Sequence, residues 1–313
     1  MAIGFWAAAG YPSLLKPRSR LRTAFEYGLA FGALKSLQVL PLSAAERLAR
    51  CYARLLDRLA PRLRRVALRN LALAMPEKTT TEHRRIADGV FRSIARVILA
   101  LARFPSISRA NVSKWIRYEG YEHFEQALAR GRGVLFATAH LGNWELSAYA
   151  HALLSAPMHV LVRPLDNRRI DRLIARLRGL SGNHLIGKKD SARAILKALA
   201  ANQAVGILID QNASLEEGVF VDFFGVPACA GTAFARLAAR SGAAVIPGFA
   251  LWSEAERRYI LCFYPPLEIT GNAEDDTRRL HRQLEAVIRE YPDQWLWIHR
   301  RWNTRPPGEP PLY

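Results

Sequence analysis

Apolar runs and amphipathic stretches alternate along the chain from residue 133 onward, and this alternation constrains the fold more than any other feature. The apolar runs that predict strands are 133–138, 158–162, 204–209, 243–251 and 259–264. The stretches that predict helices lie near 145–155, 167–180, 190–201, 230–241 and 275–290. Such an alternation predicts an α/β fold with a central, mostly parallel sheet flanked by helices. In open sheets of this class the functional site lies beyond the carboxyl ends of the strands.

The first predicted strand runs into a turn that carries reactive side chains. The stretch GVLFATAHLGNWELSAY (133–149) contains His140, Gly142, Asn143 and Glu145. On one regular helix, His140 and Glu145 would lie about 140° apart and be unable to touch. With Gly142 in a tight turn and Asn143 as the helix N-cap, Glu145 is predicted to hydrogen-bond one imidazole nitrogen. The other nitrogen is then a candidate general base; the alternative is a capping arrangement with a structural histidine.

Charge and cysteine content narrow the class of protein. The 313 residues carry 45 Lys plus Arg against 27 Asp plus Glu, a formal net charge of +18, so polyanionic partners are expected. Half of the residues are hydrophobic, which is enough for a sizeable core. The cysteines Cys51, Cys229 and Cys262 are widely spaced, which argues against a disulfide framework or a zinc site and fits a reducing compartment.

The N-terminal part predicts helices that associate with a membrane. MAIGFWAAAGYPSLL (1–15) is apolar, but Pro12 interrupts it and no basic residue precedes it, so it is a poor signal peptide. The stretch 25–43 is marginal as a transmembrane helix and better suited to an interfacial one, with a core helix as the alternative. The Arg-rich stretch 47–76 predicts either a solvated basic face or a contact with anionic lipid. We therefore predict a helical, membrane-associating region over 1–120 and an α/β catalytic domain over 121–313.

Blocks spread along the chain resemble those of the lipid A biosynthesis acyltransferases, the late acyltransferases of the lysophospholipid acyltransferase superfamily. The similar blocks are HLGNWE (140–145), FEYGLAFGALKSLQVLPLS (25–43), RRVALRNLALAMPE (64–77), VLVRPLDNRRID (160–171), LIDQNASLEEGVFVDFFGVPACAGTAFARLAARSGAAVIP (208–247) and WLWIHRRWNTRPPG (295–308). The DQN at 210–212 departs from the best-known lauroyl transferases and is the form of a broader set of members.

The resemblance implies transfer of a fatty acyl chain from a thioester of acyl carrier protein or coenzyme A. The implied acceptor is a hydroxyl of a phosphorylated lipid A precursor, with no cofactor and no metal. It implies His140 as the base that activates the hydroxyl and Glu145 as its orienting partner. The implied setting is the cytoplasmic face of the inner membrane, with acyl carrier protein and anionic membrane lipid as partners.

Further candidate residues follow the strands that end at the same edge. Backbone N–H groups near Gly142 and Asn143 are candidate oxyanion donors. Arg163 suits an acceptor phosphate, with a surface pair to Asp166 as the alternative. Asp210 and Gln211 are expected to hold Arg163 or sugar hydroxyls, or to form a turn. The phenylalanines of VFVDFFG (219–225) predict core or an acyl groove, and the Trp and Arg cluster at 295–302 predicts either a core cap or an interfacial belt.

Other classes of function fit the sequence less well. A nucleic-acid-binding protein would explain the charge, but the basic residues are spread over several helices without a recognised module. A non-catalytic basic membrane scaffold would not need the His140 and Glu145 pair. Among enzymes, the nearest alternative is a transferase that acylates another glycolipid, such as a phosphatidylinositol mannoside, or an aminolipid.

Overall fold

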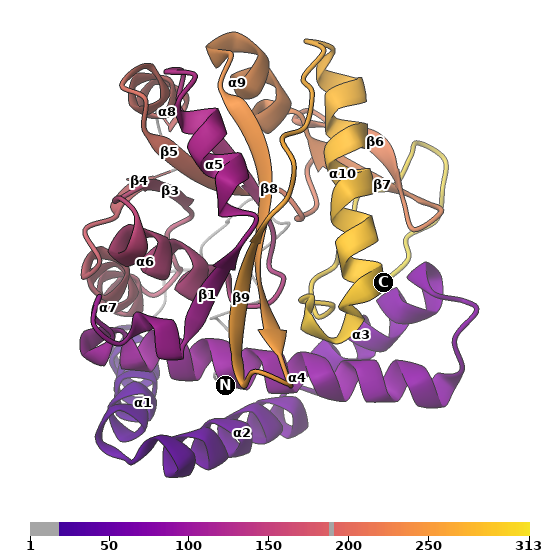
Figure 1. Cartoon of the computed structure of the whole chain (residues 1–313). Coiled ribbons are helices and arrows are strands. Elements are labelled where there is room, and N and C mark those ends of the chain that lie inside the picture. The colour runs from indigo at the N-terminus through magenta and orange to yellow at the C-terminus, as the bar shows by residue number, and fades with distance from the viewer. Residues whose placement is uncertain (1–18, 188–190) are drawn as a thin grey trace.

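The computed structural model describes residues 19–187 and 191–313, and the predicted mixed α/β fold is confirmed in them (Figure 1). The segment 1–15, judged a poor signal peptide, lies outside the described residues. The strands of the main sheet are β1 (Ile116–Glu119), β2 (Val134–Thr138), β3 (His159–Val162), β4 (His184–Gly187), β5 (Ala204–Leu208), β8 (Ala244–Ser253) and β9 (Arg258–Phe263). Their order is β1-β9-β8-β2-β5-β3-β4, and every neighbouring pair is parallel except β8 with β9.

The centre of the sheet explains the apolar runs in the sequence. Strand β2 lies between β5 and β8, and Val134, Leu135, Phe136 and Ala137 are all buried, because side chains on both faces are covered by helices. All five predicted strands are present within a few residues of their expected ends. A separate antiparallel hairpin joins β6 (Gly218–Phe223) and β7 (Val226–Gly231).

Helices cover the sheet and extend beneath it. Those after β1 are α5 (Tyr121–Leu128), α6 (Trp144–Leu154), α7 (Arg168–Gly179), α8 (Ser191–Ala200), α9 (Ala233–Ser241) and α10 (Ala273–Glu290). Those before β1 are α1 (Arg20–Val39), α2 (Leu42–Leu59), α3 (Pro61–Ala74) and α4 (Thr80–Arg103). The long helix α4 begins with a capping box between Thr79 and Glu82 and crosses the molecule below the sheet (Figure 1).

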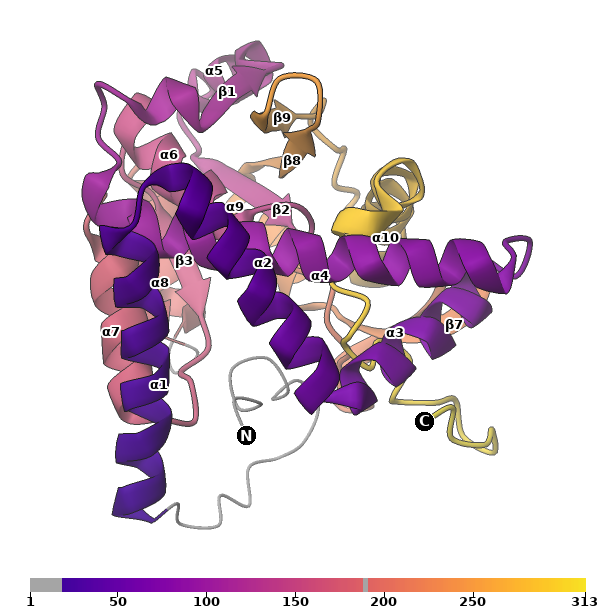
Figure 2. The same cartoon turned by 90° about the horizontal axis from the view of Figure 1, so that it is seen from below.

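The N-terminal helices pack on α4, and α1 and α2 lie on its side away from the sheet (Figure 1). Figure 2, seen from below, shows α2 crossing α4, α3 alongside α4, and α1 beside α7. The side-chain amide of Asn167, the N-cap of α7, donates to the Thr23 carbonyl (3.0 Å) and to Glu26 (3.1 Å), which ties α7 to α1. Within the described residues, none of the helices combines the length and the apolar character needed to cross a bilayer. The predicted division of the chain at residue 120 stays a prediction.

Candidate active site

The turn after β2 has the local structure that the sequence predicts. Gly142 adopts φ +64°, and a Cβ atom there would lie 1.9 Å from the Ala250 carbonyl oxygen, so only glycine fits. The Asn143 side chain accepts from the Leu146 N–H at 3.0 Å and starts α6 as its N-cap. This short connection leaves His140 at the carboxyl edge of the central strand.

His140 is held by Asp210, which comes from the end of the neighbouring strand. Nδ1 of the imidazole lies 2.9 Å from Oδ1 of Asp210, and the His140 backbone N–H donates to Oδ2 at 3.0 Å. The indole N–H of Trp295 also donates to Oδ2, at 2.9 Å. A carboxylate only accepts hydrogen bonds, so Nδ1 carries the proton and Nε2 keeps its lone pair. The partner of His140 is therefore Asp210, for which the sequence predicted a contact with Arg163 or sugar hydroxyls, or a role in a turn.

The electrostatic environment keeps Asp210 ionised. The carboxyl group is 3% exposed, and burial by itself would raise its pKa. The adjacent imidazole and the indole N–H outweigh burial and hold the pKa of Asp210 well below its usual value. A fixed carboxylate behind the ring orients the imidazole and stabilises its protonated form.

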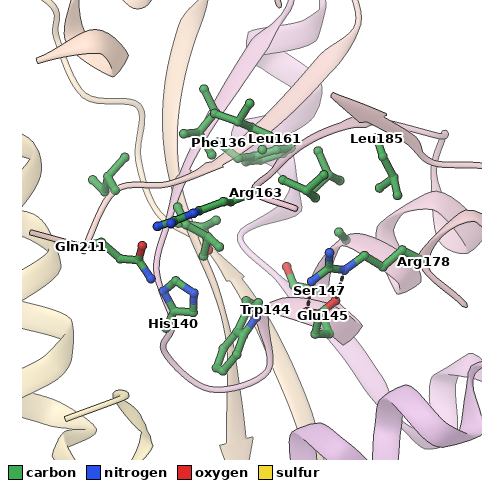
Figure 3. Close-up of a pocket in the computed structure, with 18 of the residues that line it drawn as sticks. Phe136, His140, Trp144, Glu145, Ser147, Leu161, Arg163, Arg178, Leu185 and Gln211 are labelled. Carbon is green, nitrogen blue, oxygen red and sulfur yellow. Dashed lines mark hydrogen bonds and ion pairs between the residues drawn. The ribbon is translucent and has the colours of Figure 1, made fainter. Parts of the chain in front are cut away.

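Glu145 does not make the predicted hydrogen bond to His140. Its carboxylate forms a two-point ion pair with Arg178 on α7, with Nε to Oε2 at 2.8 Å and Nη2 to Oε1 at 2.6 Å (Figure 3). Burial opposes ionisation of Glu145, but the Arg178 guanidinium lowers its pKa below the usual value. The prediction was wrong about this contact because the N-cap at Asn143 starts the helix so that Glu145 faces α7.

The two amides that were expected to stabilise an oxyanion are used by the fold. The Gly142 N–H donates to the Gln294 carbonyl at 3.0 Å, and the Asn143 N–H donates to the Ala250 carbonyl at 2.8 Å. Asn143 is also fully buried. The substrate-binding roles predicted for Gly142 and Asn143 are therefore replaced by structural ones, because both residues fasten the turn to β8 and to the C-terminal segment.

A cavity of about 510 Å³ opens at this edge and continues under α6. His140, Glu145, Arg163, Arg178 and Gln211 line its polar part. In Figure 3 the guanidinium of Arg163 extends toward the side of the cavity where Gln211 and His140 lie. The structure thus gathers five charged or polar side chains from β2, α6, α7 and the ends of β3 and β5 around one opening.

The inner part of the same cavity is apolar. Its lining includes Phe136, Val160, Leu261 and Phe263 from the sheet and Leu101 from α4. Such a combination of polar and apolar lining suits an amphiphilic substrate. Among the described residues, no group of three His, Cys, Asp or Glu side chains is arranged to hold a metal ion.

Two residues of this site were not predicted. Arg178 stands near the end of a predicted helix, where a basic residue is ordinary, so the sequence carried no distinguishing signal. Trp295 belongs to the cluster 295–302, which the sequence predicted to be either a core cap or an interfacial belt. Its side chain is only 1% exposed, so the core cap is the correct alternative. Phe223 packs against Trp295, with ring centroids 5.7 Å apart, so that part of VFVDFFG belongs to the core.

Comparisons with known proteins identify the family of the chain. A family model described as bacterial lipid A biosynthesis acyltransferase matches residues 15–304. The chain is 28% identical over 288 residues to the lipid A biosynthesis lauroyltransferase of Escherichia coli, covering 91% of this chain and 94% of that protein. It is 31% identical over 254 residues to the palmitoleoyltransferase of the same organism, covering 79% of this chain and 81% of that protein. The predicted family is confirmed: the chain belongs to the bacterial lipid A biosynthesis acyltransferases.

Proposed function

We propose that this acyltransferase moves a fatty acyl chain from a thioester, on acyl carrier protein or coenzyme A, to a hydroxyl of a lipid A precursor. The observation that carries the proposal is the His140–Asp210 pair, whose imidazole lines a mainly apolar cavity. The two curated relatives above are named for transfer of lauroyl and palmitoleoyl chains, which supports an acyl chain as the transferred group. In this proposal the chain occupies the apolar part of the cavity and its carbonyl carbon lies next to His140.

The reaction needs one base and no covalent acyl-enzyme. Nε2 of His140 takes the proton of the acceptor hydroxyl as the oxygen attacks the thioester carbonyl. The tetrahedral intermediate then collapses, the new ester forms and the C–S bond breaks. The imidazolium returns its proton to the departing thiolate, so the enzyme ends in its starting state. Asp210 stabilises the imidazolium between these two transfers.

The basic residues around the opening fit a phosphorylated acceptor. Arg163 lines the cavity, and its planar guanidinium can bind a phosphate through two parallel hydrogen bonds. We propose that Arg163 binds an acceptor phosphate and that Gln211 contacts the sugar. Glu145 acts by holding Arg178 in place, so the pair shapes the wall of the cavity beside the reacting groups.

The exposed surface of α1 supports docking to an anionic bilayer. Leu21 is 83% exposed and Phe25 is 59% exposed, and Leu29 continues the same exposed side of the helix. Large apolar side chains beside a strong net positive charge are typical of interfacial helices. Because Asn167 joins α1 to α7, docking through α1 would bring the cavity close to the lipid acceptor. We propose the cytoplasmic face of the inner membrane as the site of action.

Membrane docking predicts co-sedimentation with vesicles that contain anionic phospholipid. High salt should release little of the protein, because apolar burial adds to the screened charge. Phe25→Glu should weaken binding markedly. Gln126→Glu is the control, because it makes the same change of charge at an exposed position on α5, and it should not weaken binding to the vesicles. Equal binding by both variants, or complete recovery in the supernatant at low salt, would contradict the docking proposal.

The catalytic proposal is tested by acyl transfer from a labelled carrier-protein thioester to a phosphorylated lipid A precursor. His140→Ala removes the base, and we expect the rate to fall about 10²–10⁴-fold, the usual effect of losing a general base. Circular dichroism checks the fold of the variant. Transfer near the wild-type rate by folded His140→Ala would show that the histidine has only a structural role.

A further inference from the structure

One line of side chains on α6 forms part of the cavity wall. Glu145, Ala148 and His151 follow each other at a spacing of three residues, and all three line the cavity. Residues at this spacing are neighbours on a helix surface. Glu145 lies at the start of α6 beside the opening, so the line runs inward and ends at His151.

The distance between His151 and His140 can be estimated along two routes, one along α6 and one along β2. It follows Trp144, the first residue of α6, by seven residues, which corresponds to about 10 Å along the helix axis. Its ring centroid is 5.5 Å from that of Phe136, which precedes His140 by four residues, about 13 Å of extended chain. The two routes agree that His151 stands on the order of 10 Å from the catalytic imidazole, on the inner side.

The His151 ring is rigidly held in a neutral form. Nδ1 lies 3.1 Å from the Tyr118 hydroxyl, and the rings of Phe124, Phe136 and Phe263 surround the imidazole. Nε2 is buried and has no hydrogen-bond partner among the described residues. Burial lowers the pKa of His151 to about 4, which keeps the ring uncharged at neutral pH. An uncharged, packed ring can contact an alkyl chain without the cost of a buried charge.

Two glycines of the sheet line the cavity that His151 also lines. Gly206 on β5 and Gly248 on β8 both line the cavity, on either side of β2. Glycine weakens a strand interior and often marks a place where a ligand approaches the backbone closely. A Cβ atom at Gly248 would meet Phe136 Cδ1 at 3.5 Å, an ordinary van der Waals contact, so an alanine fits there without a clash.

We propose that His151, held by Tyr118, forms the end wall of the acyl cavity and sets the longest chain that the enzyme transfers. The assignment rests on the proposed function, because it requires an acyl chain in this cavity. A chain that fits would end against the imidazole. A longer chain would have to displace a ring that is hydrogen-bonded and enclosed by three phenylalanines.

The proposal is tested by competition among lauroyl, myristoyl, palmitoyl and stearoyl carrier-protein thioesters, with the products separated by mass. His151→Ala enlarges the inner end and should raise the ratio of longer to shorter chains about ten-fold or more, the effect of changing a pocket by about one methylene. Gly248→Ala adds a methyl group without a clash and should shift the ratio toward shorter chains. His281→Ala is the matched control: His281 is another buried neutral histidine, on α10, that does not line the cavity.

The outcomes separate this assignment from the proposed function. An unchanged chain preference in folded His151→Ala, or the same change in His281→Ala, overturns the end-wall assignment while acyl transfer stands. If His151→Ala does not fold, Gly248→Ala decides, and a wild-type preference in that variant overturns the assignment. Absence of transfer by the wild-type enzyme with every chain overturns the proposed function itself.

Discussion

Asp210→Asn should abolish catalysis while leaving the site assembled. Two N–H donors, the His140 amide and the Trp295 indole, point at Oδ2, so the amide oxygen of the new side chain will take that position. Its NH₂ group then faces Nδ1 of His140, which must become an acceptor. The ring proton moves to Nε2, and the nitrogen that should take a proton from the acceptor no longer can.

The size of the effect follows from this change of tautomer. The same substitution behind a catalytic histidine in serine proteases lowers kcat about 10⁴-fold, and that corresponds to about 5 kcal/mol of transition-state stabilisation. We expect a similar loss here, with little change in the KM for the acyl donor. All three hydrogen bonds are retained, so the free energy of unfolding should fall by only about 1–3 kcal/mol.

The assay is single-turnover acyl transfer from a labelled thioester, with urea unfolding as the measure of stability. Trp295→Phe is a useful comparison, because it removes one hydrogen bond to Asp210 and leaves the His140 tautomer unchanged. It should therefore cost far less activity than Asp210→Asn. A folded Asp210→Asn enzyme that works within about ten-fold of the wild-type rate would refute the assigned role of Asp210.

Two further predictions concern the other charged residues of the cavity. Arg178→Leu leaves the buried Glu145 carboxylate without its partner and should lower the free energy of unfolding by about 3–5 kcal/mol, measured by urea titration. The double variant Arg178→Leu with Glu145→Leu should recover much of that loss. Equal instability of the single and the double variant would contradict the assigned role of the ion pair. Arg163→Lys should mainly raise the KM for a phosphorylated acceptor, because a point charge loses the two-point geometry. An acceptor without phosphate should give no difference between Arg163→Lys and wild type, and an unchanged KM with the phosphorylated acceptor would return Arg163 to a surface role.

Three of the strands that the sequence predicted, β2, β5 and β8, are buried on both faces. Val134 to Ala137 form an unbroken apolar run because β2 lies at the centre of the sheet. The hairpin strands β6 and β7 were not predicted. In the main sheet the missed strands are β1, with sequence IRYE, and β4, with sequence HLIG, which are four residues long and lie at the two edges. Their partly exposed side chains give neither a long apolar run nor a clear alternation, so only tertiary pairing defines them.

The sequence predicted the turn after β2 but not the partner of His140, because the turn depends on local residues and the partner on a long-range contact. Gly142 and Asn143 act on their own neighbours in the chain, so the sequence contains that information. Asp210 lies 70 residues away, and its position depends on the register of β2 and β5, in which Thr138 pairs with Leu208. His140 and Asp210 each stand two residues beyond these paired ends, and the strand register alone therefore brings them together.

The C-terminal segment has a consequence for the timing of enzyme synthesis. The Leu296 N–H binds the His140 carbonyl, the Gln294 carbonyl binds Gly142, and the Trp295 indole binds Asp210. A ribosome adds Gln294 only 84 residues after Asp210. At about 5–20 residues per second, the growing polypeptide therefore contains His140 and Asp210 for many seconds before the C-terminal segment that binds them has been made. We therefore expect a nascent chain that has not yet reached Trp295 to be inactive in acyl transfer, because its His140 and Asp210 lack these contacts.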